Sequence, residues 1–147
     1  TKAGTGSCTR SGTLRTLTTP LRVPYLLQPI RVATSTFGRD LTITWDKNNC
    51  PSSGYHILYG YGSGLRTWSI AGGVCSLGTT GNVQWTSTPD PRTNPTRLLW
   101  FLVAGDNGAA TEGSWGVTSA GAERGGAAAS GVCGITVKST SGYCAAP

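Results

Sequence analysis

Several residue types are scarce or missing in this chain of 147 residues. It has no Met, only three Lys and two Glu, and 12% charged residues, whereas Thr, Ser and Gly are abundant. Because good helix formers are so few, the composition excludes a helical bundle and favours an all-β, turn-rich fold with one compact core and extensions. No apolar run in the sequence is long enough to span a membrane, so no membrane span is expected.

Positive charge is in excess, with 12 Lys and Arg against 6 Asp and Glu and a net charge of +6. Residues 1–39 carry six cations and no acid, whereas residues 40–147 carry six of each sign. The whole excess therefore belongs to the N-terminal quarter. These cations are widely spaced among Thr and Leu, which is more typical of the polar side of an extended strand than of a nucleic-acid patch, so no nucleic-acid partner is expected.

The first 27 residues predict an extended arm, because the small polar segment TKAGTGSCTRSGT at its start cannot form a core. From Leu17 onward the odd positions are mainly apolar, which indicates a strand with one apolar face. Pro20 and Pro24, on the other parity, lack an N–H, so this strand belongs at a sheet edge or on another surface. The side chains expected to dock are those of Leu17, Leu21, Val23, Tyr25 and Leu27.

Short apolar runs bounded by Gly-rich turns predict the strands of the rest of the chain. They lie at residues 41–45, 55–59, 65–70, 82–86, 98–104 and 134–138. The run LLWFLVA at 98–104 is apolar on both parities, so both of its faces should be covered. The segment VTSAGAERGGAAASG at 117–131 is low in bulk and predicts a loop.

Four segments in order resemble a fibronectin type III domain: LTITWD, YHILY, WFLVAGDNG and GSW, within residues 28–118. The later Cys-containing segments GVCSLG, GAERGG and GVCG are similar to fibronectin-like C-terminal modules of secreted bacterial proteins. The resemblance implies an immunoglobulin-like antiparallel β-sandwich that is secreted, extracellular or on the cell surface, and it implies no single activity. The chain is then divided into an N-terminal arm at 1–27, the sandwich at 28–118 and a disulfide-pinned C-terminal extension at 119–147.

Five cysteines in a small chain indicate disulfides and an oxidising compartment, and the start at Thr1 fits a mature product whose leader was removed. A bridge between Cys50 and Cys75 could close one loop, and Cys133 and Cys144 could pin the tail, although the sequence leaves the connectivity open. Cys8 is then the odd cysteine, either a free thiol or, as we expect, an intermolecular or arm-anchoring bond.

No motif assembles a catalytic, metal or cofactor site. The only imidazole is that of His56, which lies in a predicted strand and should pack or face solvent. No C-x-x-C pair is present, and the acids in predicted loops are better explained by turn chemistry. The Gly-rich segment 60–64 lacks the Lys-Ser/Thr ending of a phosphate loop. We therefore expect no enzyme and no cofactor.

Three features suggest a function: an arm with an apolar face, an odd cysteine in it, and a core strand that is apolar on both faces. An arm that docks on the next subunit accounts for all three, and a head-to-tail contact that does not close gives a filament. The sequence therefore predicts a bacterial structural subunit that polymerises with its own copies into a pilus-like extracellular filament. The alternative is an adhesive module that binds a glycan or surface protein through Tyr61 and Trp68, with its arm packed on its own domain.

Overall fold

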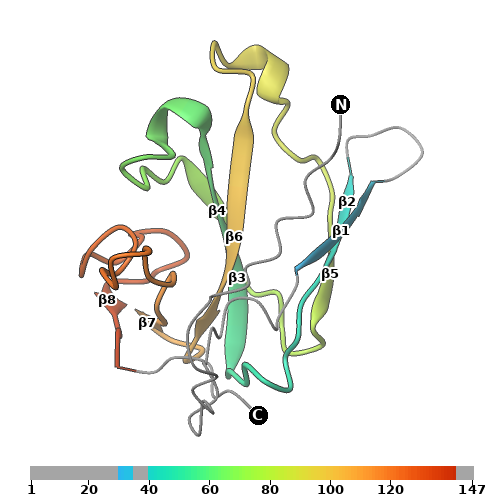
Figure 1. Cartoon of the computed structure of the whole chain (residues 1–147). Coiled ribbons are helices and arrows are strands. Elements are labelled where there is room, and N and C mark those ends of the chain that lie inside the picture. Colours follow the sequence, from blue (N-terminus) through green and yellow to red (C-terminus); the bar gives the residue numbers. More distant parts are fainter. Residues whose placement is uncertain (1–29, 35–39, 142–147) are drawn as a thin grey trace, which may run out of the picture.

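The computed structural model describes residues 30–34 and 40–141, which form two β-sheets and almost no helix (Figure 1). The all-β fold class is therefore confirmed. Two 3-10 turns, η1 and η2, are the helical elements of these ranges, and neither could cross a membrane. The first sheet has the order β1-β2-β5 and the second the order β4-β3-β6-β7-β8. The arm at 1–27 and Cys144 lie outside the described residues.

The bounds of the elements follow the apolar runs closely in the centre of the chain. The first sheet consists of β1 (Arg31–Thr34), β2 (Leu41–Thr44) and β5 (Asn82–Trp85). The second sheet consists of β3 (Gly54–Tyr61), β4 (Gly72–Val74), β6 (Leu99–Asp106), β7 (Thr111–Glu112) and β8 (Val137–Lys138). The 3-10 turns are η1 (Gly62–Gly64) and η2 (Pro91–Thr93).

One predicted strand is wrong and another is shorter than predicted. Residues 65–68 form turns after η1 and residues 69–70 have no regular structure. Trp68 has a φ of 56°, in the left-handed region that strands do not adopt. Strand pairing with β3 begins only at Gly72, which lies opposite Tyr59. The last predicted strand, 134–138, is reduced to β8.

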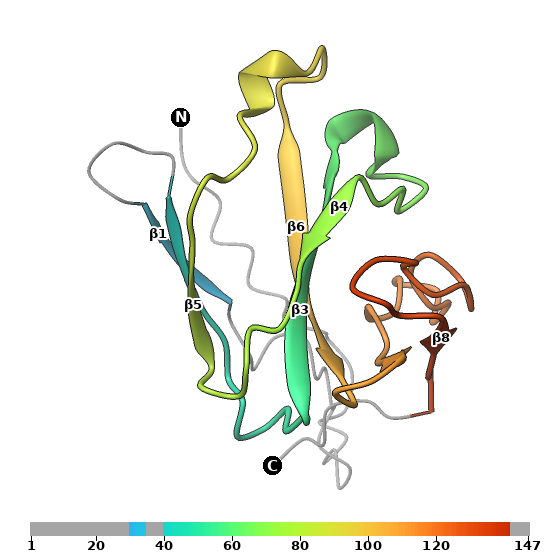
Figure 2. The ribbon, with the colours of Figure 1, turned by 180° about the vertical axis from the view of Figure 1, so that it is seen from behind.

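The main core lies between the two sheets, around Ile43, Ile57 and Trp85. Figure 2 shows the two sheets from behind. Their contact is made largely by aromatic rings, since the ring centroids of Tyr59 and Trp85 are 5.5 Å apart and those of Trp85 and Phe101 are 5.8 Å apart. The alternation seen in the sequence thus places one parity of each central strand in this core.

A second core lies on the outer face of the second sheet. Leu58 and Ala104 are buried there beneath Trp115 and Val132. These two residues belong to the C-terminal lobe, which we define as residues 113–138 (Figure 1). The expectation that something covers the outer face of the 98–104 run is confirmed, but the cover comes from this lobe and does not require the arm.

A disulfide ties the lobe to the sheet. Cys75, directly after β4, is bonded to Cys133, with a Cα–Cα distance of 5.4 Å and a separation of 58 residues. The suggested pairings Cys50–Cys75 and Cys133–Cys144 are therefore wrong. Spacing could not reveal this bond, because only the folding of the lobe over β3 and β4 brings the two cysteines together. Cys50 is also disulfide-bonded, while Cys8 lies outside the described residues.

Replacing both Cys75 and Cys133 with Ser should destabilise the protein. A bridge that closes a loop of 58 residues contributes about 4 kcal/mol in the chain-entropy estimate. We expect the free energy of unfolding in urea to fall by about that amount, and limited proteolysis to cut first within residues 113–138. Unchanged stability with an intact lobe would contradict this account of the bond.

Candidate functional site: the open edge of β6

The strand β6 is fully paired on one side only. On that side β3 pairs with it along its whole length, from Gly54 opposite Asp106 to Tyr61 opposite Leu99. On the other side β7 reaches it through a single pair, Asp106 with Glu112, which is flanked by two hydrogen bonds, from the N–H of Asn107 to the carbonyl of Thr111 and from the N–H of Gly113 to the carbonyl of Gly105. From Leu99 to Ala104, no described residue pairs with this side of β6. This part of the strand is an open sheet edge within the described ranges.

The direction of the backbone groups along this edge follows from two hydrogen bonds. The carbonyl of Leu98 accepts from the N–H of Gly62 beside β3, at 3.0 Å, and the carbonyl of Gly105 accepts from the N–H of Gly113 beside β7, at 2.8 Å. Backbone groups alternate in direction from residue to residue in a strand. The residues that direct their N–H and C=O groups to the open side are therefore Leu99, Phe101 and Val103.

The same three residues point their side chains into the main core, where all three remain half-buried. Beside Leu99 and Phe101 lies a cavity of about 530 Å³ that Leu41 and Leu98 also line. Leu98 is 46% exposed. Within the part of the chain that the structure describes, the open edge thus combines unpaired backbone groups with an incompletely covered apolar face.

In the described residues, β1, the edge strand of the first sheet, is also incompletely covered on the side that faces the open edge of β6. β2 lies across from β6, because Leu41 and Phe101 line one cavity, and β5 lies across from β3. By the order of strands, β1 then lies across from the side of β6 on which no described strand pairs with residues 99–104. Val32 of β1 is opposite the buried Ile43 and so shares its inward face, yet it is 48% exposed.

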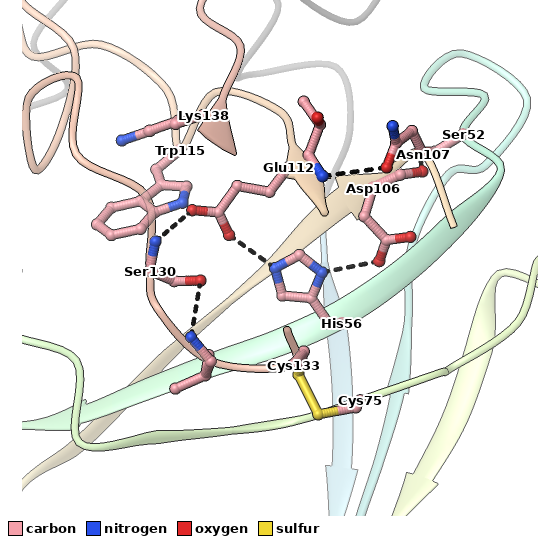
Figure 3. Close-up of polar contacts among 12 residues, drawn as sticks. Ser52, His56, Cys75, Asp106, Asn107, Glu112, Trp115, Ser130, Cys133 and Lys138 are labelled. Atoms are coloured by element: carbon pink, nitrogen blue, oxygen red, sulfur yellow. Dashed lines mark hydrogen bonds and ion pairs between the residues drawn. A yellow bond between two sulfur atoms is a disulfide. The ribbon is translucent and has the colours of Figure 1, made fainter. Parts of the chain in front are cut away.

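Close to the end of β6, a buried histidine joins two carboxylates (Figure 3). The side chain of His56 is fully buried, with Nδ1 2.8 Å from Oδ2 of Asp106 and Nε2 2.9 Å from Oε2 of Glu112. Burial lowers the pKa of His56, but the hydrogen bonds to Glu112 and Asp106 outweigh it, so that the pKa is raised above its ordinary 6.5. An imidazolium donates from both nitrogens, which suits two carboxylate partners.

Glu112 also binds the C-terminal part of the lobe and the residue that follows it. Its Oε1 accepts the N–H of Ser130 at 2.6 Å (Figure 3). Its backbone carbonyl accepts the N–H of Ser139 at 2.8 Å. Since Glu112 is fully buried and bound to His56 as well, the chain is fixed at the end of β7 and then crosses to the outer face of the sheet. It does not continue alongside β6.

The buried ammonium of Lys138 closes the other end of the lobe. Its Nζ lies 2.9 Å from a carboxylate oxygen of Glu123, donates to the carbonyls of Arg124 and Gly126, and sits 3.7 Å from the ring centroid of Trp115. An ammonium with this many partners tolerates burial because its charge is matched and its donors are used. These contacts make the lobe a fixed part of the fold.

The network around His56 was not predicted, since the sequence suggested a histidine that packs or faces solvent. One signal could have predicted this network. Asp106 lies at the end of an apolar strand, and Glu112 follows six residues later, across a turn. Both ring nitrogens are occupied by carboxylates and the ring is buried, so the network holds structure and offers no free nitrogen to a ligand. In the described ranges, no group of three His, Cys, Asp or Glu residues could hold a metal ion.

Trp68 and Tyr61, the residues predicted to bind a ligand at the surface, are both partly buried. Trp68 is half-buried, with its ring 5.5 Å from that of Trp100 and the guanidinium of Arg124 5.2 Å above it. Tyr61 is half-buried at the end of β3. The predicted docking side chains of the arm, from Leu17 to Leu27, lie outside the described residues. The sequence analysis did not predict an open edge at β6. The signal for it is the Gly-rich sequence after Glu112, which contains no apolar run long enough to form a strand beside β6.

No protein-family model, curated protein or solved structure matches this chain. The resemblance to fibronectin type III domains therefore stays an expectation from the sequence. Function has to be inferred from the geometry of this chain alone.

The charge on His56 should make stability depend on pH. Its pKa is raised in the folded state, so its contribution is fully present below the ordinary pKa near 6.5 and is lost as the pH rises through the raised value. We expect the difference in unfolding free energy between the wild type and His56→Gln to shrink as the pH is raised above 6.5. Urea unfolding of both proteins across this range measures it. A difference that stays constant or grows would contradict a charged His56.

Proposed function

We propose that this chain is a non-enzymatic, extracellular structural subunit that assembles head-to-tail with its own copies through its N-terminal arm. The observation that carries this proposal is the open side of β6, where backbone groups without a partner among the described residues and half-buried apolar side chains occur on the same strand. An exposed edge of this kind is a template for the addition of another strand.

The arm has the chemistry that this edge needs. Its odd positions from 17 to 27 are mainly apolar, and Arg22 lies on the opposite parity, away from the face that would dock. One added strand would form hydrogen bonds with the backbone groups of Phe101 and Val103 and would cover the inward-facing side chains of β6. Burying each large apolar side chain contributes about 1.5–3 kcal/mol, so three of them supply several kcal/mol toward association before the entropy cost.

The strand order supports an immunoglobulin-like reading of the fold. In such domains strands A, B and E share one sheet and strands C, F and G the other. Assigning β1, β2 and β5 to A, B and E, and β3 and β6 to C and F, leaves the place of strand G beside β6 without a full-length strand in the described residues. Among residues 30–34 and 40–141, no strand takes the full place of strand G, and an arm can supply one.

The disulfides support a location outside the cytoplasm. Cys75 is bonded to Cys133, and Cys50 is disulfide-bonded too, which is typical of proteins that mature in an oxidising compartment. The alternative, a glycan-binding or adhesive module, would need an exposed aromatic platform. Trp68 does not favour it, because Trp100 and Arg124 already contact its ring.

Removal of residues 1–27 should leave soluble monomers, because the donor strand is lost while the open edge remains. Electron microscopy and sedimentation velocity measure the outcome. A matched pair of full-length variants separates the apolar face from the charge of the arm. Leu21→Lys with Val23→Lys should abolish assembly, whereas Thr16→Lys with Thr18→Lys should not. Fibres formed by the truncated protein would show that the arm is not the connector.

A further inference from the structure

The direction in which a strand is added to β6 decides which of its residues must supply hydrogen bonds. In an antiparallel pair, residues directly opposite each other exchange both bonds and place their side chains on the same face. In a parallel pair, a residue bonds instead to the two neighbours of the residue opposite it. The open side of β6 offers backbone groups from Leu99, Phe101 and Val103, whose side chains face the core.

The prolines of the arm distinguish the two directions. For the apolar side chains of Leu21, Val23 and Tyr25 to enter the core, antiparallel addition uses the N–H groups of these same residues. Parallel addition would require the N–H groups of the even residues between and beside them, and those include Pro20 and Pro24, which have none. Antiparallel addition places both prolines on the outer, unpaired edge of the new strand.

The chain's own arm cannot reach this antiparallel position. Leu41, which pairs with Thr34, lies at the Leu99 end of β6, so β1 begins at the opposite end, near Gly105. Further contacts agree, since Trp45, just after β2, packs on Tyr55, the residue opposite Gly105. An antiparallel arm would bring residue 27 to the Leu99 end, about 20 Å or more from the start of β1 along the strand direction.

The four steps of chain from Leu27 to Arg31 span at most about 14 Å. That is shorter than the distance along the strand, and the gap of about 10 Å between the two sheets adds to the shortfall. An own arm could lie beside β6 only in the parallel direction, which the prolines disfavour. The antiparallel strand has to come from another molecule.

We propose that the open edge of β6 binds residues 17–27 of a second copy of this chain, of which residues 21–25 add to the sheet as an antiparallel strand, with Leu21, Val23 and Tyr25 opposite Val103, Phe101 and Leu99. This inference rests on the proposed function and specifies its contact. The register places Tyr25, the largest of these side chains, beside the cavity of about 530 Å³ at Leu99.

The same register explains where the added strand ends. Pro20 comes next to the point where Gly113 already occupies the edge through its bond to Gly105, so the donor leaves the sheet there. Arg22, on the other parity, keeps its charge away from the cavity, whose rim carries Arg92 and Arg97. Like charges are thereby kept apart.

The direction can be tested with three synthetic peptides of residues 17–27 as competitors of assembly of the full-length chain. One is unmodified, one carries a methyl group on the backbone nitrogen of Val23, and one carries it on the backbone nitrogen of Arg22. Methylation removes one N–H and keeps the side chain. Light scattering measures the concentration of each peptide that halves assembly.

The unmodified and Arg22-methylated peptides should inhibit equally, and the Val23-methylated peptide should be about tenfold weaker or worse, because it leaves a buried acceptor of β6 unpaired. The reverse ranking would mean parallel addition and would overturn the inference. Equal potency of all three, or no inhibition by the unmodified peptide, would overturn it too. A full-length chain that stays monomeric at all concentrations would instead overturn the proposed function.

The origin of the donor can be tested in the full-length chain by Tyr25→benzoylphenylalanine, a photoreactive substitution. Isotope-labelled chains with this substitution are mixed with unlabelled chains without it, assembled and irradiated. We expect cross-links from position 25 to the peptide that contains Leu99 and Phe101 of unlabelled chains. Cross-links confined to the labelled chain itself would show that the arm docks on its own domain and would overturn the inference.

Discussion

The carboxylate of Glu112 is held from two sides, by the ring of His56 and by the N–H of Ser130, and the course of the chain after β7 depends on it. A strand that follows an antiparallel partner across a tight turn normally continues along it. Here it separates from β6 after one residue pair and crosses to the outer face of the sheet. A buried ion pair with both partners hydrogen-bonded is costly to break, so this departure is firmly set.

The departure has two consequences, one on each side of β6. On the outer face, the lobe brings Trp115 over Ala104, and the Cys75–Cys133 bond keeps it there. At the edge, the place beside Phe101 and Val103 is left without a described partner. In the described residues the second sheet is thus covered on its outer face and open at one edge. Natural proteins usually protect such an edge, and in the proposed assembly a donated strand would protect it.

The sequence predicted the strands correctly where apolar residues at every second position face the main core. Ile43 and Trp85 could be assigned to a β core because both of their sequence neighbours are polar, and Ile57 because it alternates with the residues of the opposite face, His56 and Leu58. The strand predicted at residues 65–70 is wrong because the apolar side chain of Trp68 packs against Trp100 from a turn. Apolarity alone does not tell a strand from a turn that folds over one.

The site was harder to predict because it depends on contacts between distant segments. Nothing local to Cys75 or to Cys133 indicates that they meet, and nothing local to His56 indicates two acids 50 and 56 residues away. Whether a strand lies at a sheet edge depends on its neighbours in space, so the sequence of β6 itself does not indicate that β6 has an open side. What the sequence did reveal was the complementary half, an arm with one apolar face and prolines on the other.

The most direct measurement is amide hydrogen exchange at β6, resolved by residue, in the monomeric and the assembled protein. The N–H groups of Phe101 and Val103 face the open side, whereas that of Leu102 faces β3. On this account Phe101 and Val103 exchange fast in the monomer and become protected on assembly, while Leu102 is protected in both states. Rates for Phe101 and Val103 that stay the same in both states would contradict strand addition at this edge.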